Sequence, residues 1–212
     1  MPAPDNVAIL HRERLVKTSV IDQADWNYRW ILGRILRLRY SQIVRWLPSK
    51  CMRLLEIGYG SGVFMPTLRP RAVGLYGLDL HGQAAQVKNA LAAEGIYAEL
   101  VQASADAIPF ATGTFDCIVV ASTLEFVCDL DVACCEIRRI LIPGGTFIAV
   151  TPIESPLLDF GLKVLTGKSA KRDFGARRRK VVPTLRRNFT VTEHRILKAG
   201  LLPAYDALLM TQ

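Results

Sequence analysis

Several residues and patterns that mark whole classes of protein are scarce in this chain of 212 residues. It has three histidines and five cysteines, and no cysteine pair has C-x-x-C spacing. Scattered histidines and an odd number of cysteines indicate neither a metal site nor a disulfide framework, so we expect reduced, mostly buried thiols. No unbroken apolar stretch reaches the roughly 18 residues of a membrane span, and no basic segment leads into an apolar one as in a signal peptide. These absences predict a single globular domain in the cytoplasm.

Acidic residues are also few, 19 against 27 lysines and arginines, which gives a formal net charge of +8. The excess is concentrated at 29–45 and at 168–187, where Asp173 is the single acid. A solvated basic loop, a contact with an anionic acceptor or an anionic membrane, and a nucleic-acid partner all remain open for the second segment. Nucleic acid is the least favoured, because one aromatic residue, Phe174, offers little stacking for bases.

The most informative motif is a glycine turn at 52–62, MRLLEIGYGSG, with glycine at alternate positions after an apolar run. Such a strand and turn bring backbone N–H groups close to a ligand. The dinucleotide fingerprint G-x-G-x-x-G has its third glycine one residue later. Glu56 just before the turn would repel a pyrophosphate but would suit a ligand with an ammonium and a sulfonium group.

A second acid follows at the end of the next apolar run, VGLYGLDL at 73–80. Asp79 comes 19 residues after Gly60 (79 − 60), the distance at which an acid holds a ribose diol in α/β nucleotide folds. The alternative role for Asp79 is to cap the following helix.

With these two motifs the chain resembles the class I S-adenosylmethionine-dependent methyltransferases, in particular their small-molecule branch. The resemblance covers about residues 50–152, including ADAIPFATGTFDCIVVASTLEFVCDLDVACCEIRRILIPGGTFIAVTP at 105–152, and more faintly 189–210. It implies an α/β fold, a Rossmann-like doubly wound and mainly parallel sheet in a three-layer sandwich. It also implies S-adenosyl-L-methionine as cofactor and an in-line, metal-free methyl transfer to a small acceptor, apolar or anionic. Two alternatives stay open: a catalytically silent binding or regulatory protein, and an RNA methyltransferase.

The resemblance also implies which residues contact the cofactor. Glu56 would meet its amino end, Asp79 its ribose, and Leu80 the adenine face. Where the family often has Gly-Asp-Ala, this chain has Ala-Ser-Ala at 103–105, so Ser104 would accept one hydrogen bond from adenine. The complete set of expected cofactor residues is Glu56, Gly58, Tyr59, Gly60, Asp79, Leu80, Ser104, Ala105 and Ser122.

No catalytic base stands out. Phe126 replaces the histidine of the Leu-Glu-His sequence that is common in this branch. The remaining candidates are Glu125, His81 and His194, each with a simpler alternative as a helix-terminal acid or a surface histidine.

Hydrophobic periodicity gives the expected elements and four segments. The segments are an N-terminal helical cap (1–48), a cofactor-binding core (49–152), an insertion (153–188) and a last helix and strand (189–212). Expected strands are 53–57, 73–78, 98–101, 116–121, 146–151 and 204–211, and expected helices are 7–22, 26–47, 61–68, 82–94, 130–141, 156–165 and one from Thr190 or Thr192 to Gly200.

Two points remain open at this level. The helix 26–47 has an apolar face opposite Arg34, Arg37 and Arg45, and fits a helix packed on the domain edge, a lid over the site or a membrane-surface helix. The family's seventh strand is not evident, so either 181–189 supplies it or the sheet is truncated. The oligomeric state is not indicated.

Overall fold

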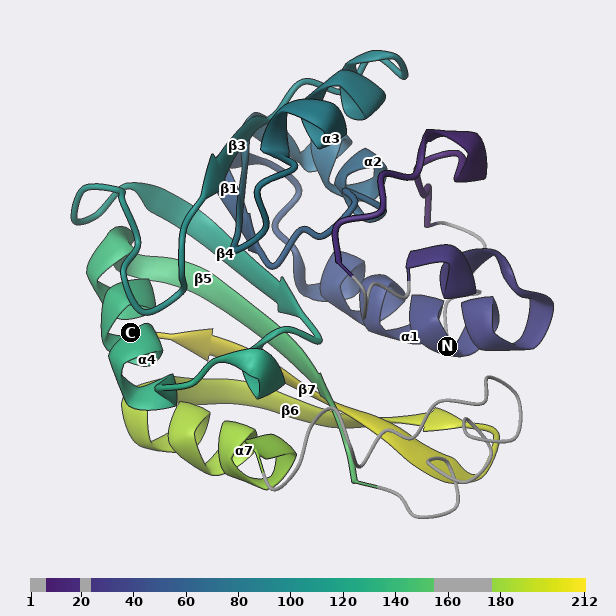
Figure 1. Ribbon diagram of the computed structural model, residues 1–212. Helices are drawn as coiled ribbons and strands as arrows, with labels where there is room; N and C mark the ends of the chain where they lie inside the picture. The colour runs from purple at the N-terminus through teal and green to yellow at the C-terminus, as the bar shows by residue number, and fades with distance from the viewer. Residues whose placement is uncertain (1–6, 20–23, 155–176) are drawn as a thin grey trace.

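A computed structural model, which describes residues 7–19, 24–154 and 177–212, contains one seven-stranded sheet in the order β3-β2-β1-β4-β5-β7-β6 (Figure 1). Neighbours among β1 to β5 are parallel, whereas β7 is antiparallel to both β5 and β6. The strands are β1 Cys51–Ile57, β2 Ala72–Asp79, β3 Glu99–Gln102, β4 Phe115–Ala121, β5 Leu141–Pro152, β6 Thr190–Ala199 and β7 Leu202–Thr211. The helices are α1 Trp30–Trp46, α2 Met65–Leu68, α3 Ala84–Ala92, α4 Leu130–Ile140 and α7 Arg177–Asn188, with 3-10 turns η2 Arg12–Arg14, η3 Ala24–Tyr28, η4 Arg69–Arg71 and η5 Leu124–Phe126.

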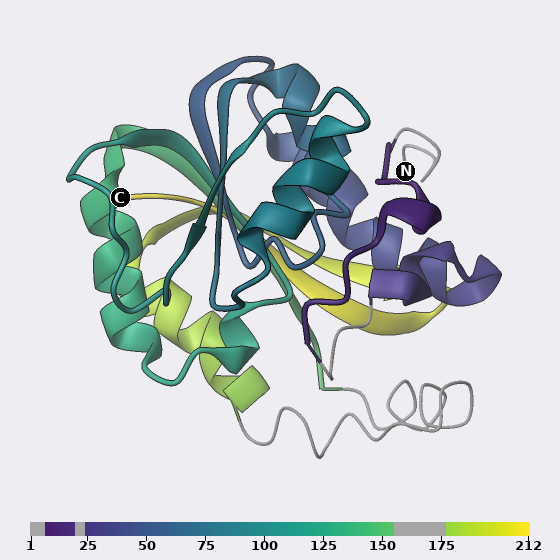
Figure 2. The same cartoon turned by 45° about the horizontal axis from the view of Figure 1, so that its top comes forward.

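Helices cover both faces of this sheet, as Figure 2 shows. Alternate strand residues feed two cores, because successive side chains point to opposite faces. Leu54 lies in the core under α1, α2 and α3, and its neighbour Leu55 lies in the core under α4 and α7. The predicted doubly wound, three-layer α/β fold is confirmed.

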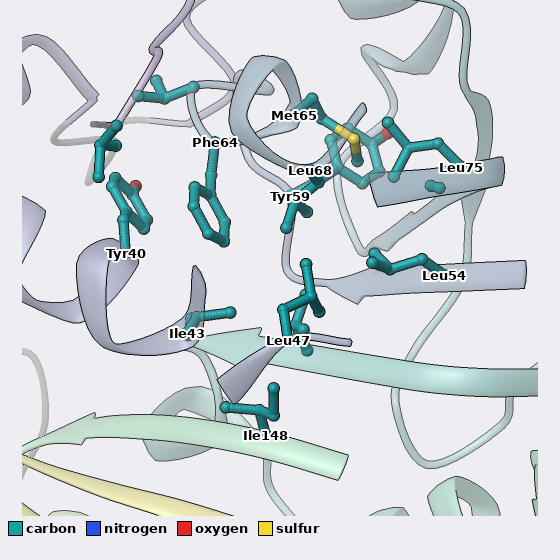
Figure 3. Packing of buried hydrophobic residues seen from close by; sticks show 14 of the residues in the cluster. Tyr40, Ile43, Leu47, Leu54, Tyr59, Phe64, Met65, Leu68, Leu75 and Ile148 are labelled. Atoms are coloured by element: carbon teal, nitrogen blue, oxygen red, sulfur yellow. The ribbon is translucent and has the colours of Figure 1, made fainter. Parts of the chain in front are cut away.

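The helix α1 packs directly on the sheet. Tyr40, Ile43 and Leu47 are buried, and the Tyr40 ring stacks on Phe64 with ring centroids 4.2 Å apart (Figure 3). The helix ends at Trp46 because Pro48 prevents its continuation. The predicted helix at 26–47 is thus confirmed from residue 30 onward. No helix in the described ranges combines the length and the apolarity needed to cross a membrane.

The expected helix at 7–22 is wrong for the described residues 7–19, which form an extended strap with one 3-10 turn. Leu10 is fully buried, its N–H donates to the Val63 carbonyl over 3.2 Å, and Thr67 donates its hydroxyl to the Ala8 carbonyl. Hydrogen bonds to other parts of the chain replace those within a helix, and buried apolar residues such as Leu10 hold the segment against the core.

The C-terminal third also differs from expectation. The segment 190–200, expected as a helix, is strand β6, and Gly200 lies in the β6–β7 turn at φ +64°. Strand β6 is the seventh strand of the sheet, so both expected alternatives, a strand at 181–189 and a truncated sheet, are wrong. The basic residues from Arg177 onward form helix α7, where a loop was expected. The expected helix at 156–165 lies outside the described residues.

Candidate cofactor and acceptor site

The three glycines of the turn after β1 all have positive φ, +79° at Gly58, +52° at Gly60 and +74° at Gly62. A Cβ at Gly58 would lie 2.1 Å from the Thr123 hydroxyl oxygen, so this glycine allows the turn after β4 to approach. At Gly62 a Cβ would press on α3 side chains at 3.1 to 3.3 Å, so this glycine allows α3 to pack closely on the turn. At Gly60 nothing lies within 4 Å, so this position leaves open space for a ligand. The expected helix at 61–68 is reduced to α2 because the turn continues to residue 64.

Asp79 at the end of β2 is tied to the glycine turn. The Gly60 N–H donates to its Oδ2 over 2.8 Å, and the Leu80 N–H donates to its Oδ1 over 2.7 Å. Helix α3 begins later, after Gln83, with no side-chain cap, so Asp79 is not its N-cap. The Asp79 side chain stays partly exposed, which leaves carboxylate lone pairs for ligand hydroxyls. Leu80 beside it is 69% exposed and offers an uncovered apolar face.

Glu56 at the end of β1 is the most unusual group of the site. It is 3% exposed, and its Oε2 has no hydrogen-bond partner. Burial, opposed by Arg39 and assisted by Asp79, raises the pKa of Glu56 to about 8. A buried, unsatisfied carboxyl oxygen costs free energy unless a donor arrives, so it indicates a position for a cationic donor of a ligand. The hydroxyls of Tyr59, Ser61 and Ser122 are also buried without a partner.

The two candidate histidines have both ring nitrogens engaged. In His81, Nδ1 accepts from the Gln83 N–H at 3.1 Å, so Nε2 carries the proton and donates to the Gly60 carbonyl at 2.9 Å. In His194, on the face of the sheet that α7 covers, Nδ1 lies 3.0 Å from Arg186 and Nε2 lies 2.7 Å from Asp206. This geometry assigns His81 to holding the glycine turn, and it leaves no ring nitrogen for an acceptor's proton.

Ser104 and Ala105 lie just beyond β3. The Ala103 N–H donates to the Asp79 carbonyl over 2.9 Å, which holds this segment next to the end of β2. The Ala105 side chain is buried in the core under α4 and α7, and Ser104 is partly buried. Their contact with adenine stays a prediction.

A second polar group gathers around Glu125, which is 1% exposed. The Thr151 hydroxyl donates to Glu125 Oε2 over 3.4 Å. Burial raises the pKa of Glu125 to about 7, while Arg178, Arg39 and the Thr151 hydrogen bond pull it down. The same arginines act on Tyr205, whose pKa burial raises.

Sequence reasoning proposed Glu125 but missed the residues around it. The one signal for Arg39 is its spacing, because it lies three residues after Leu36 and four before Ile43, two apolar residues of the same predicted helix. No local signal separates Arg178 from the exposed arginines on either side of it.

The sheet order, the glycine turn and the acids at two strand ends define a nucleoside-binding α/β domain of the methyltransferase type. Residues 55–149 match the family model described as "Methyltransferase domain". This segment, somewhat less than half of the chain, carries the motifs of the class I S-adenosylmethionine-dependent methyltransferases, in agreement with the prediction from the sequence.

Curated relatives agree with this prediction, and solved structures share the fold. The chain is 29% identical over 133 residues to a demethylmenaquinone methyltransferase of Thermus thermophilus. This aligned region covers 61% of this chain and 60% of the relative. It is 34% identical over 122 residues to a malonyl-[acyl-carrier protein] O-methyltransferase of Geobacter sulfurreducens, covering 55% and 43%. The match therefore spans less than two thirds of the length of these relatives. The structure of the N-methyltransferase NodS of Bradyrhizobium japonicum, in complex with S-adenosyl-L-homocysteine, shares the fold with a TM-score of 0.65, 20% identity and coverage of 91% and 93%.

Proposed function

We propose that this protein transfers a methyl group from S-adenosylmethionine to a small-molecule acceptor. The observation that carries the proposal is the pair of acids at adjacent strand ends, Glu56 on β1 and Asp79 on β2, on either side of a glycine turn. The names of the curated relatives, demethylmenaquinone methyltransferase and malonyl-[acyl-carrier protein] O-methyltransferase, support this class of reaction.

The residues present fit the methyl donor. The orphan oxygen of Glu56 suits the ammonium of its methionine part, and the lone pairs of Asp79 suit its ribose diol. The open space at Gly60 leaves room between them, and the exposed Leu80 suits the adenine ring. When bound, S-adenosylmethionine supplies a methyl group on a sulfonium, which is reactive without a metal.

The chain's own contribution is to bind, orient and exclude water. His81 and Asp79 fix the glycine turn through bonds to the Gly60 carbonyl and N–H, so the backbone is arranged before the ligand arrives. Thr123 packs closely against Gly58, so η5, which contains Glu125, lies at the same end of the sheet. Alignment of donor and acceptor in a dry site is sufficient for an in-line displacement.

The basic helix α7 does not by itself favour a nucleic-acid acceptor. Arg187 pairs with Asp131 at 2.6 Å and Arg179 pairs with Glu154 at 2.5 Å, so acids of this chain take part of its charge. Contact with an anionic membrane and a cytoplasmic location remain predictions from the sequence, as does the division into four segments.

Titration calorimetry with S-adenosylhomocysteine tests the proposal. Asp79→Asn keeps the size of the side chain but loses its charge, and should weaken binding about 10- to 150-fold, which corresponds to the 1.5–3 kcal/mol of a charged hydrogen bond. Asp25→Asn, at an exposed position on η3, is the control and should bind like the parent protein. Absence of binding by the parent protein, or equal affinity in Asp79→Asn, would contradict the proposal.

A further inference from the structure

Five side chains from five elements form a buried polar cluster at the carboxyl ends of the central strands. They are Arg39 on α1, Glu125 on η5, Thr151 on β5, Arg178 on α7 and Tyr205 on β7. Glu125, Thr151, Arg178 and Tyr205 are all buried, and Arg39 is partly buried. So many polar groups converge in a protein interior only where they satisfy one another or a ligand.

The cluster adjoins the methionine end of the cofactor site. Thr123 closes on Gly58, and η5 with Glu125 follows Thr123 directly. Arg39 also lies close enough to both Glu56 and Glu125 to lower the pKa of each. A molecule held in the cluster would therefore lie beside the reactive end of the donor.

The charges of the cluster favour an anion. Burial raises the pKa of Glu56 to about 8 and that of Glu125 to about 7. At neutral pH these two carboxyls therefore carry together less than one negative charge, against the guanidiniums of Arg39 and Arg178. Tyr205 stays protonated, because burial raises its pKa further.

We propose that this cluster is the acceptor site and that it takes a small molecule with an acidic hydroxyl group, a phenol or an enol, whose proton passes to Glu125. The inference rests on the proposed function. It assigns Arg39 and Arg178 to holding the oxygen as its negative charge develops, and Glu125 to the role of general base.

The reaction balances with these groups alone. The O–H bond breaks, its proton goes to Glu125, and the oxygen forms a bond to the methyl carbon of the donor. The donor's sulfur keeps the electron pair of the broken carbon–sulfur bond and leaves as a neutral thioether. Glu125 then returns the proton to solvent, which a carboxyl with its pKa near neutrality does readily.

The proton exchange between acceptor and Glu125 can be measured without turnover. The probe is 4-nitrophenol at about pH 8, where the free probe and most of the Glu125 carboxyl are ionised. Two buried anions side by side repel each other, so binding of the phenolate should take up about one proton, detected by calorimetry in buffers of different ionisation enthalpy. Glu125→Gln should bind the phenolate without proton uptake. Equal uptake in both proteins would remove Glu125 as the base.

The arginines are tested by matched pairs on the same helices. Arg39→Gln and Arg178→Gln should each weaken phenolate binding by about tenfold or more, because each removes a charge-assisted hydrogen bond. Arg34→Gln on α1 and Lys180→Gln on α7, both at exposed positions, should leave it unchanged. Losses of the same size in the control pair would assign the effect to overall charge and overturn the site. If an arginine variant fails to fold, Tyr205→Phe, which removes one hydroxyl, should still weaken binding of 4-nitrophenolate.

S-adenosylhomocysteine separates this inference from the proposed function. If that compound binds and 4-nitrophenol does not, the acceptor site is wrong and the methyltransferase proposal stands. If 4-nitrophenol binds with proton uptake and S-adenosylhomocysteine does not bind, the cluster is an anion site and the proposed function fails.

Discussion

Binding of S-adenosylhomocysteine should strengthen as pH rises, because Glu56 has to ionise before it can pair with the ligand's ammonium. The structure holds this carboxyl 3% exposed, and burial raises its pKa to about 8. The protein without ligand is therefore mostly protonated at Glu56 at neutral pH, and binding should release that proton.

The size of the effect follows from the fraction of ionised Glu56. With a pKa of about 8, this fraction rises from about 1% at pH 6.0 to about 24% at pH 7.5, so the affinity should increase about 25-fold. Above that range the ligand's own α-amino group begins to lose its proton, and the affinity should level off. Arg39 and Asp79 are the charged groups that act on Glu56.

Calorimetry between pH 6.0 and 7.5, in buffers of different ionisation enthalpy, measures both affinity and proton release. Glu56→Gln should bind more weakly and show no dependence on pH. Glu125→Gln controls for the other carboxyl that titrates near this range, and should keep the parent slope. A flat profile in the parent protein, or the same slope in Glu56→Gln, would refute the assignment of Glu56 to the ammonium group.

Three further predictions concern the glycine turn and the buried acids. Gly58→Ala should lower the free energy of unfolding by about 2 kcal/mol or more, because its Cβ would meet Thr123. Gly60→Ala should stay folded but lose affinity for S-adenosylhomocysteine. Thermal melts measure the first effect and calorimetry the second, and a destabilised Gly60→Ala beside a stable Gly58→Ala with weakened binding would refute these separate roles. His81→Ala should weaken ligand binding through the loosened turn, and His81→Asn should restore part of it; unchanged affinity in His81→Ala would contradict the positioning role. The unfolding temperature of the ligand-free protein should fall as pH rises from about 5 to 8 and then level off, because over this range the carboxyl of Glu56 keeps its proton in the folded protein but ionises in the unfolded chain. Glu56→Gln should reduce the fall, and an equal fall in that variant would exclude this acid as its source.

Local patterns predicted most of the fold and singled out the residues that we propose for the cofactor end of the site. A buried parallel strand reads as an apolar run, and an acid or glycine at its end is visible in the sequence, so Glu56, Gly60 and Asp79 could be placed before the structure was known. Strand β6 could not, because it is an edge strand in which Leu197 is the one buried residue, and its exposed side chains show no alternation.

The cluster around Glu125 was hidden for another reason. Arg39, Arg178 and Tyr205 come from elements far apart in the chain, and only the packing of α1, α7 and β7 on one end of the sheet brings them together. Each is unremarkable in its own sequence context. Tertiary convergence of this kind has no local signature.

The strand order β5-β7-β6 has a consequence for the growing polypeptide. During translation β6 leaves the ribosome before β7, yet β7 lies between it and β5. Until β7 emerges, β6 has no neighbour in the sheet and β5 keeps an open edge of unpaired N–H and C=O groups, the kind of edge that invites association with other chains. A nonsense codon just before residue 202 would therefore remove two strands from the sheet while deleting the sequence of one.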